Sequence, residues 1–73
     1  MELKIGDIAR VTGIKDYKFV KLVDIDEKNS VGVLLYFNSD NIGPKTRFPL
    51  SAIVRHFKEF KCSGPWIVKY KGV

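Results

Sequence analysis

The sequence predicts an all-β fold, a small and strongly bent β-barrel of five to six strands. The main observation is that short apolar runs are each closed by turn residues within a few positions, at Ile5–Val11, Phe19–Ile25, Val31–Phe37, Thr46–Pro49 and Ile53–Phe57. The second is length, because 73 residues make one domain that must build a compact core. The third is composition: 45% of the residues are hydrophobic and nine are aromatic, which supplies such a core.

The first half of the chain predicts an opening strand and a hairpin. The opening strand falls within Ile5–Val11, where a Gly-Asp turn precedes alternating residues, and a polar, glycine-containing loop follows it. Phe19–Ile25 and Val31–Phe37 then form a hairpin, with Asp26–Asn29 as the turn between them. Gly32 marks a bulge or a close approach of another segment to the backbone of the return strand.

The next segment predicts a loop and a short strand. Residues 38–45 are dense in turn formers, which indicates an exposed loop. Arg47–Leu50 follows as a short strand. Pro49 has no backbone donor, so this strand belongs at a sheet edge or ends at the proline.

Ser51–Lys61 is compatible with a helix and with a strand. Four apolar residues in this segment have helical spacing, namely Ile53, Val54, Phe57 and Phe60. A serine at the start of the segment could cap a helix, and Gly64 beyond its end could terminate one. We predict instead a short 3₁₀ turn near 51–53 followed by a strand, because a barrel needs a closing strand at this point. The helix remains the alternative.

The end of the chain predicts an extra C-terminal strand. Cys62–Pro65 has the composition of a turn, and Trp66–Tyr70 alternates apolar residues after it. We therefore expect residues 1–73 to form a single domain in which 58–73 is a C-terminal extension of the barrel.

Two short segments, KIGDIARV at residues 4–11 and RFPLSAI at residues 47–53, follow patterns of a known group of folds. The first resembles the GDxVxV opening of SH3-like small barrels, and the second resembles their closing short strand, turn and last strand. This superfamily includes KOW and Tudor modules and the small barrel subunits of photosynthetic electron-transfer complexes. The resemblance covers residues 4–57 and implies an SH3-like barrel. The chain departs from KOW motifs, whose glycine is absent from residues 20–23.

Positive charge is concentrated in the second half of the chain. The net charge is +5, and residues 37–73 carry all of this excess, with seven Lys or Arg against two acidic residues, whereas residues 1–36 hold six of each. A one-sided positive field attracts anionic partners such as nucleic acid or an acidic protein face. The alternative is that the excess charge only keeps the domain soluble.

The residue inventory argues against an enzyme, a metal site and a cofactor. The single cysteine, Cys62, allows no intrachain disulfide, which suits a reducing cytoplasm, and with His56 as the single histidine no four-ligand zinc site can form. Neither residue has the partners that a nucleophile or general base requires. No secretory signal and no run of about 20 apolar residues is present, so we expect a cytoplasmic protein without a membrane span.

The candidate binding site is a basic and aromatic surface in the C-terminal half. Cations that neutralise phosphates and rings that stack on bases together suit single-stranded nucleic acid. The candidate residues are Lys45, Arg47, Arg55, Lys58, Lys61, Trp66, Lys69, Tyr70 and Lys71. Tyr36 is a further candidate stacking platform. A small core also needs its largest side chain, so burial of Trp66 in the domain is the stronger alternative for that residue.

The prediction is therefore a small, non-enzymatic, basic binding module whose first candidate partner is nucleic acid. The second candidate is an acidic protein, bound by charge or by strand addition, as an accessory subunit of a complex or a phage-encoded modifier would bind its target. We expect a monomer or a weak homodimer formed through Trp66–Tyr70, and no small-molecule substrate is evident.

Overall fold

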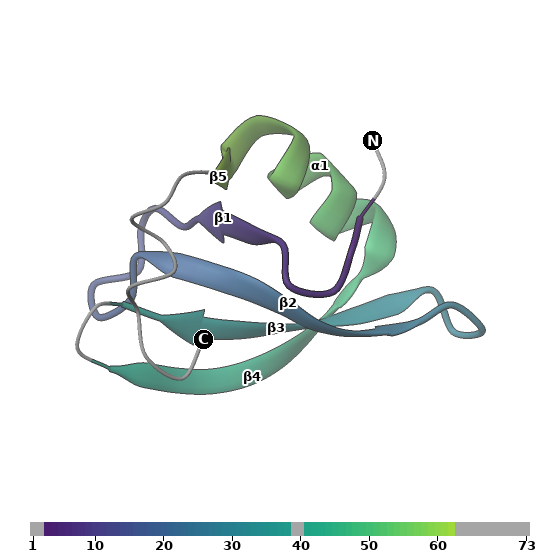
Figure 1. The fold of residues 1–73 in the computed structure, drawn as a ribbon, viewed down its shortest axis with the longest axis horizontal. Coiled ribbons are helices and arrows are strands. Elements are labelled where there is room, and N and C mark those ends of the chain that lie inside the picture. The colour runs from purple at the N-terminus through teal and green to yellow at the C-terminus, as the bar shows by residue number, and fades with distance from the viewer. Residues whose placement is uncertain (1–2, 39–40, 63–73) are drawn as a thin grey trace.

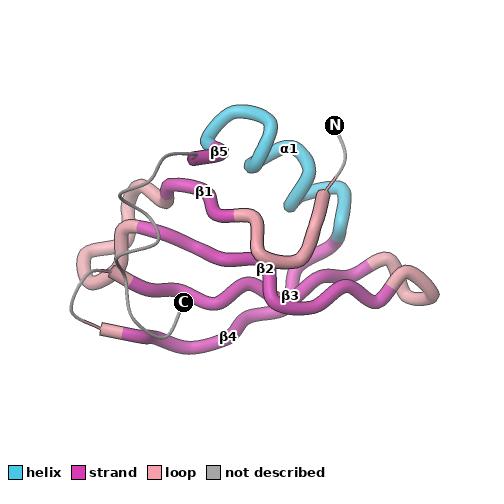
Figure 2. The backbone as a smooth tube through the Cα atoms, viewed as in Figure 1, coloured by secondary structure: helices cyan, strands magenta, loops and turns pink. Residues whose placement is uncertain are grey.

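The structure is a computed structural model that describes residues 3–38 and 41–62. These residues form an antiparallel five-stranded sheet in the order β4-β3-β2-β1-β5, with one helix packed on it (Figures 1 and 2). The elements are β1 (Ile8–Arg10), β2 (Phe19–Asp26), β3 (Val31–Phe37), β4 (Ile42–Pro49), α1 (Leu50–Phe60) and β5 (Lys61–Cys62). The mostly β architecture expected from the sequence is confirmed, with a helix added to it.

The β2–β3 hairpin matches its prediction. Its register pairs Lys21 with Leu35 and Leu22 with Leu34, and the register shifts between Leu22 and Asp24. At the end of the turn, Ser30 takes the left-handed backbone conformation, with φ of 56°. The hairpin is the centre of the sheet, with β1 on one side and β4 on the other.

The face of the sheet that meets α1, here called the inner face, carries the main core. Alternate residues of each strand point to it, and paired residues share a face. Its buried members are Ala9, Val20, Leu22 and Leu34, which pack with Ile53 and Phe57 of the helix. Gly32 also lies on this face: a Cβ there would stand 2.7 Å from Ile53 Cδ1, so the predicted close approach is the packing of α1.

The strand predicted after a 3₁₀ turn near 51–53 is wrong, because Leu50–Phe60 is an α-helix. Helical spacing places Ile53 and Phe57 on one face, and both are fully buried against the sheet. The predicted serine cap is also absent, since the helix begins after Pro49, whose φ of −58° suits a helix start and which makes no side-chain cap. Burial of one apolar helix face decided the conformation of this segment.

The predicted closed barrel is wrong for the same reason. Residues 53–57 are helical, so within the described ranges no strand joins the free edge of β4, and the sheet stays open. The loop predicted at 38–45 is also shorter, because β4 begins at Ile42. Pro44 and Pro49 lie in this strand, which is consistent with its place at the edge. The predicted strand Trp66–Tyr70 lies outside the described residues.

The opposite side of the sheet, here called the outer face, has buried apolar residues of its own. Phe19 pairs with Phe37 across β2 and β3, and their rings stack with centroids 5.5 Å apart. Phe37 is fully buried, and Phe19 and Leu35 are 8% and 7% exposed. In the described part of the chain, the single helix is too short and too polar to cross a membrane.

Candidate functional site

Edge strand β4 presents two cations on the outer face. Lys45 pairs with Leu35 and Arg47 pairs with Val33, so both side chains share the face of the outer apolar residues. Both are exposed, whereas Thr46 and Phe48 between and after them are half-buried toward the helix. Residues two apart in a strand are separated by about 6.6 Å, so the two charges form a short stripe along the edge.

Two further cations continue this surface across the sheet. Lys21 pairs with Leu35 and therefore lies in the same cross-strand row as Lys45. Arg10 of β1 pairs with Phe19 and is exposed on the same face. We call Arg10, Lys21, Lys45 and Arg47 the outer-face cations. They flank the buried patch of Phe19, Leu35 and Phe37 on three strands.

The outer-face cations have no ion pair among the described residues. The one ion pair there joins Lys61 Nζ to Asp7 Oδ2 at 3.7 Å, at the β5 side of the sheet. An exposed pair of this kind contributes about 0–1 kcal/mol. Lys61 is therefore partly neutralised within the domain, whereas the outer-face cations remain available to an external anion.

Acidic groups gather at the far end of the β2–β3 hairpin. The Asp26 carboxylate accepts hydrogen bonds from Asn29 Nδ2 at 2.7 Å and from the Asn29 backbone N–H at 3.2 Å. These bonds lower the pKa of Asp26 below its ordinary value, and the charge of Arg47 lowers it further. The negative charge of Asp26 thus serves the turn. Asp24 pairs with Val33 and is also exposed on the outer face, in the same cross-strand row as Arg47, so the purely basic part of this face lies around Arg10, Lys21 and Lys45.

The predicted site residues do not form one continuous surface within the described residues. Arg55 and Lys58 are exposed on α1, which covers the inner face, so they belong to the opposite layer from Lys45 and Arg47 (Figure 1). Lys61 lies in β5 at the other edge of the sheet. The predicted site residues Trp66, Lys69, Tyr70 and Lys71 lie outside the described residues.

Tyr36, the other predicted stacking platform, faces away from the outer-face cations. It neighbours Leu35 in β3 and points to the inner face, where its ring centroid lies 6.2 Å from that of Tyr17. Tyr36 is half-buried and packs against the core. It therefore cannot stack on a base that is held by Lys45 and Arg47.

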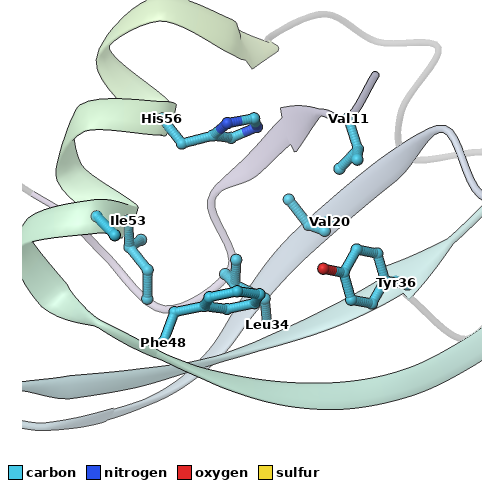
Figure 3. A pocket seen from close by; sticks show the side chains of 8 residues that line it. Val11, Val20, Leu34, Tyr36, Phe48, Ile53 and His56 are labelled. Carbon is cyan, nitrogen blue, oxygen red and sulfur yellow. The ribbon is translucent and has the colours of Figure 1, made fainter. Parts of the chain in front are cut away.

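The inner face contains an apolar pocket that sequence patterns did not indicate. Its volume is about 260 Å³, and it lies between α1 and the sheet (Figure 3). The lining side chains are Val11, Val20, Leu34, Tyr36, Phe48, Ala52, Ile53 and His56. The pocket combines residues of four strand regions with the helix, and no local motif marks such a set. Its shape can accept an apolar side chain or a small ring.

His56 is one of two polar side chains that line this pocket, together with Tyr36, and its position is determined by the fold. Its Nε2 lies 2.7 Å from the carbonyl oxygen of Arg10, and because a carbonyl only accepts, Nε2 carries the proton. Its ring also lies 4.8 Å from that of Phe60. His56 thus ties α1 to the end of β1, and this geometry gives it a structural role.

Within the described ranges, no three His, Cys, Asp or Glu side chains gather as a metal site would require. Comparison of the chain with protein-family models, with curated proteins and with solved structures finds no match.

Proposed function

We propose that this domain is a non-enzymatic nucleic-acid-binding module that holds the phosphate backbone on the outer face of its sheet. The observation that carries the proposal is the placement of Lys45 and Arg47, which are exposed on the outer face of an edge strand and form no ion pair in the described part of the chain, although the charge of Arg47 lowers the pKa of Asp26. Lys21 and Arg10 extend the same surface inward.

Phosphate neutralisation explains why such a surface binds. Each cation that contacts a phosphate releases condensed counterions, so affinity falls steeply as salt rises. Backbone contacts of this kind position a strand and carry no sequence information. The buried state of Phe19 and Phe37 removes these rings as base-stacking platforms, so we expect binding with little sequence preference.

The composition of the outer face favours a phosphate backbone over a protein partner. Cores of protein interfaces are depleted in Lys and rich in exposed aromatic anchors. The outer face offers no exposed aromatic anchor among the described residues, because Phe19 and Phe37 are buried, and its most exposed apolar side chain is Ile42, which pairs with Phe37. Among described residues the exposed large apolar side chains are scattered at Ile5, Ile14 and Ile42.

Fluorescence anisotropy with labelled single-stranded and duplex oligonucleotides of mixed sequence, over a range of salt, tests the proposal. The variant Lys45→Gln/Arg47→Gln removes two outer-face cations. Arg55→Gln/Lys58→Gln is its matched control, because it removes the same charge from the exposed face of α1. At about 50 mM salt the first variant should bind on the order of 10- to 100-fold more weakly, and the salt slope for single strands should fall by about 1.4.

The control variant should retain most of the affinity, apart from the small loss that follows a lower net charge. Equal losses in the two variants would contradict an outer-face site. Absence of binding by the wild-type protein to both kinds of oligonucleotide at low salt would reject nucleic acid and leave an acidic protein as the partner class.

A further inference from the structure

We propose that the inner-face pocket binds a free, neutral molecule with a single aromatic ring and one hydrogen-bonding group. The pocket lies between α1 and the sheet, and its lining residues Leu34 and Phe48 point away from the face that carries Lys45 and Arg47 (Figure 3). The inference is therefore independent of the proposed function, and either one can fail without the other.

The volume of the pocket limits the size of its occupant. The pocket encloses about 260 Å³. A dry apolar cavity of roughly 150 Å³ already holds benzene, whereas sites for drug-sized molecules begin at roughly 300 Å³. The space therefore suits one ring with a small substituent.

The walls of the pocket are apolar or aromatic. Val20 and Leu34 line it from the centre of the sheet. The rings of Phe48 and His56 lie on opposite sides of the space, and the Tyr36 ring lies on a third side (Figure 3). Rings pack favourably on other rings in offset or edge-on geometry. No Asp, Glu, Lys or Arg among the described residues lines the pocket, so a buried charge would lack compensation and a neutral aromatic molecule fits best.

The Tyr36 hydroxyl is the polar group that points into this space (Figure 3). It makes no hydrogen bond with the described residues, and since these residues leave no buried polar side-chain atom without a partner, its oxygen is accessible. A hydroxyl both donates and accepts, so it can bind one polar substituent of a ligand. A trapped water needs about 2–4 polar partners, and one hydroxyl in an apolar pocket does not supply them.

Contacts outside the pocket hold its two polar side chains in place. His56 Nε2 donates to the carbonyl oxygen of Arg10 at 2.7 Å, and the His56 ring lies 4.8 Å from that of Phe60. The ring of Tyr36 lies 6.2 Å from that of Tyr17. These contacts exist without a ligand, so binding requires little further ordering of side chains, which lowers its entropic cost.

The surroundings of the pocket favour a free molecule over the side chain of a protein partner. A stable protein interface buries about 800 Å² on each partner and is centred on large anchoring side chains. The exposed residues Ser51 and Arg55 of α1, which neighbour lining residues in the sequence, are polar. The exposed large apolar side chains of the described chain, at Ile5, Ile14 and Ile42, do not line the pocket. The pocket therefore lacks the apolar surroundings that a protein partner requires.

Titration of the full-length protein with phenol and with benzene, followed by ¹H–¹⁵N chemical-shift perturbation, tests the inference. The two probes differ by one hydroxyl group. We expect saturable shifts at the amides of the lining residues with both probes, and a dissociation constant about 2- to 10-fold lower for phenol, which is the effect of one net hydrogen bond. Absence of saturable shifts at these amides at millimolar concentrations of both probes would overturn the inference, as would shifts centred on the outer face.

Tyr36→Phe and a saturated probe test the two chemical features of the ligand. Tyr36→Phe removes only the hydroxyl, so it should abolish the preference for phenol and leave the affinity for benzene unchanged. Cyclohexanol keeps the hydroxyl of phenol without the aromatic ring, and it should bind the wild-type protein more weakly than phenol. A preference for phenol that persists in Tyr36→Phe, or equal binding of cyclohexanol and phenol, would contradict the inference.

A matched pair of variants in α1 locates the binding site. Ala52→Leu places a larger side chain at a lining position, whereas Ser51→Leu makes the same side chain at a neighbouring position outside the lining. Both positions are exposed in the helix and leucine is a good helix former, so both variants are expected to fold, which thermal unfolding checks. Ala52→Leu should abolish saturable binding of both probes, and Ser51→Leu should retain it. Equal affinities in the two variants would contradict the inference.

Discussion

The two faces of the sheet are both buried in places, yet they differ in what surrounds the buried residues. The inner face packs Val20, Leu22 and Leu34 against Ile53 and Phe57, and its buried cluster contains no charged side chain. The outer face buries Phe19, Leu35 and Phe37 between the outer-face cations, of which Lys21 is half-buried and the other three are exposed. One face thus consists of core alone, whereas the other combines a core patch with a charged surface.

This difference separates the residues that maintain the fold from those available to a partner. Substitutions on the inner face should lower stability without a specific effect on binding. Cation substitutions on the outer face should lower binding with little effect on stability, because exposed charges contribute little to folding. Truncation of the buried apolar residues on the outer face should lower the free energy of unfolding, because these side chains are shielded from solvent in the folded state.

The largest expected effect belongs to Phe57→Ala on the inner face. Phe57 is fully buried against the sheet, and truncation of a buried phenylalanine costs about 3–5 kcal/mol. A domain of this length has a total stability of roughly 4–11 kcal/mol. Thermal unfolding followed by circular dichroism should therefore show a large fall in the melting temperature. A decrease below about 1 kcal/mol would contradict the position of α1 on the sheet.

The comparison becomes sharper with Leu34→Ala and Leu35→Ala. These neighbours are 6% and 7% exposed on opposite faces. Each substitution should lower the free energy of unfolding by about 2–5 kcal/mol, measured by urea denaturation. A loss near zero for Leu35→Ala beside a full loss for Leu34→Ala would mean that the outer patch is open to solvent.

The smallest expected effect concerns Asp26 in the acidic turn of the outer face. Its folded-state pKa is lowered, mainly by the Asn29 side-chain hydrogen bond, so its contribution to stability is present above the unfolded pKa. That contribution is lost as the pH falls through the folded pKa. In Asn29→Ala the pKa of Asp26, followed by carboxyl ¹³C shifts, should rise toward its ordinary value.

Arg47→Gln is the companion variant for this titration. It should raise the pKa of Asp26 less than Asn29→Ala does, because the charge of Arg47 contributes less than the hydrogen bonds. An unchanged titration in Asn29→Ala would show that the turn does not hold the carboxylate as described.

Much of the sheet could be predicted from alternation in the sequence, whereas α1 could not. The β2–β3 hairpin follows from period-two patterns and a polar turn. The spacing of Ile53, Val54, Phe57 and Phe60 favours the helix, whereas closure of a barrel would require a strand in this segment. The segment is helical because a helix buries Ile53 and Phe57 against the sheet, and this tertiary contact cannot be read from the local sequence.

The candidate site could be predicted only in part. The charges of Lys45 and Arg47 identify them as candidates from the sequence. That the two share a face follows only from the start of β4 at Ile42, because the turn-forming residues 38–45 predict a loop at Lys45. The sequence analysis does not include Arg10 and Lys21 in the site. They lie on the outer face because of their pairing with Phe19 and Leu35 on neighbouring strands. The separation of these residues from Arg55 and Lys58 follows from the packing of α1, which the sequence alone does not reveal.

The most direct test of the central claim is a map of the binding surface by ¹H–¹⁵N chemical-shift perturbation, with a mixed-sequence single-stranded oligonucleotide at low salt. The account predicts that the largest shifts fall on backbone amides and side chains around Arg10, Lys21, Lys45 and Arg47, and that amides of α1 around Arg55 and Lys58 move little. Shifts centred on α1, or on the pocket around Phe48 and His56, would contradict it.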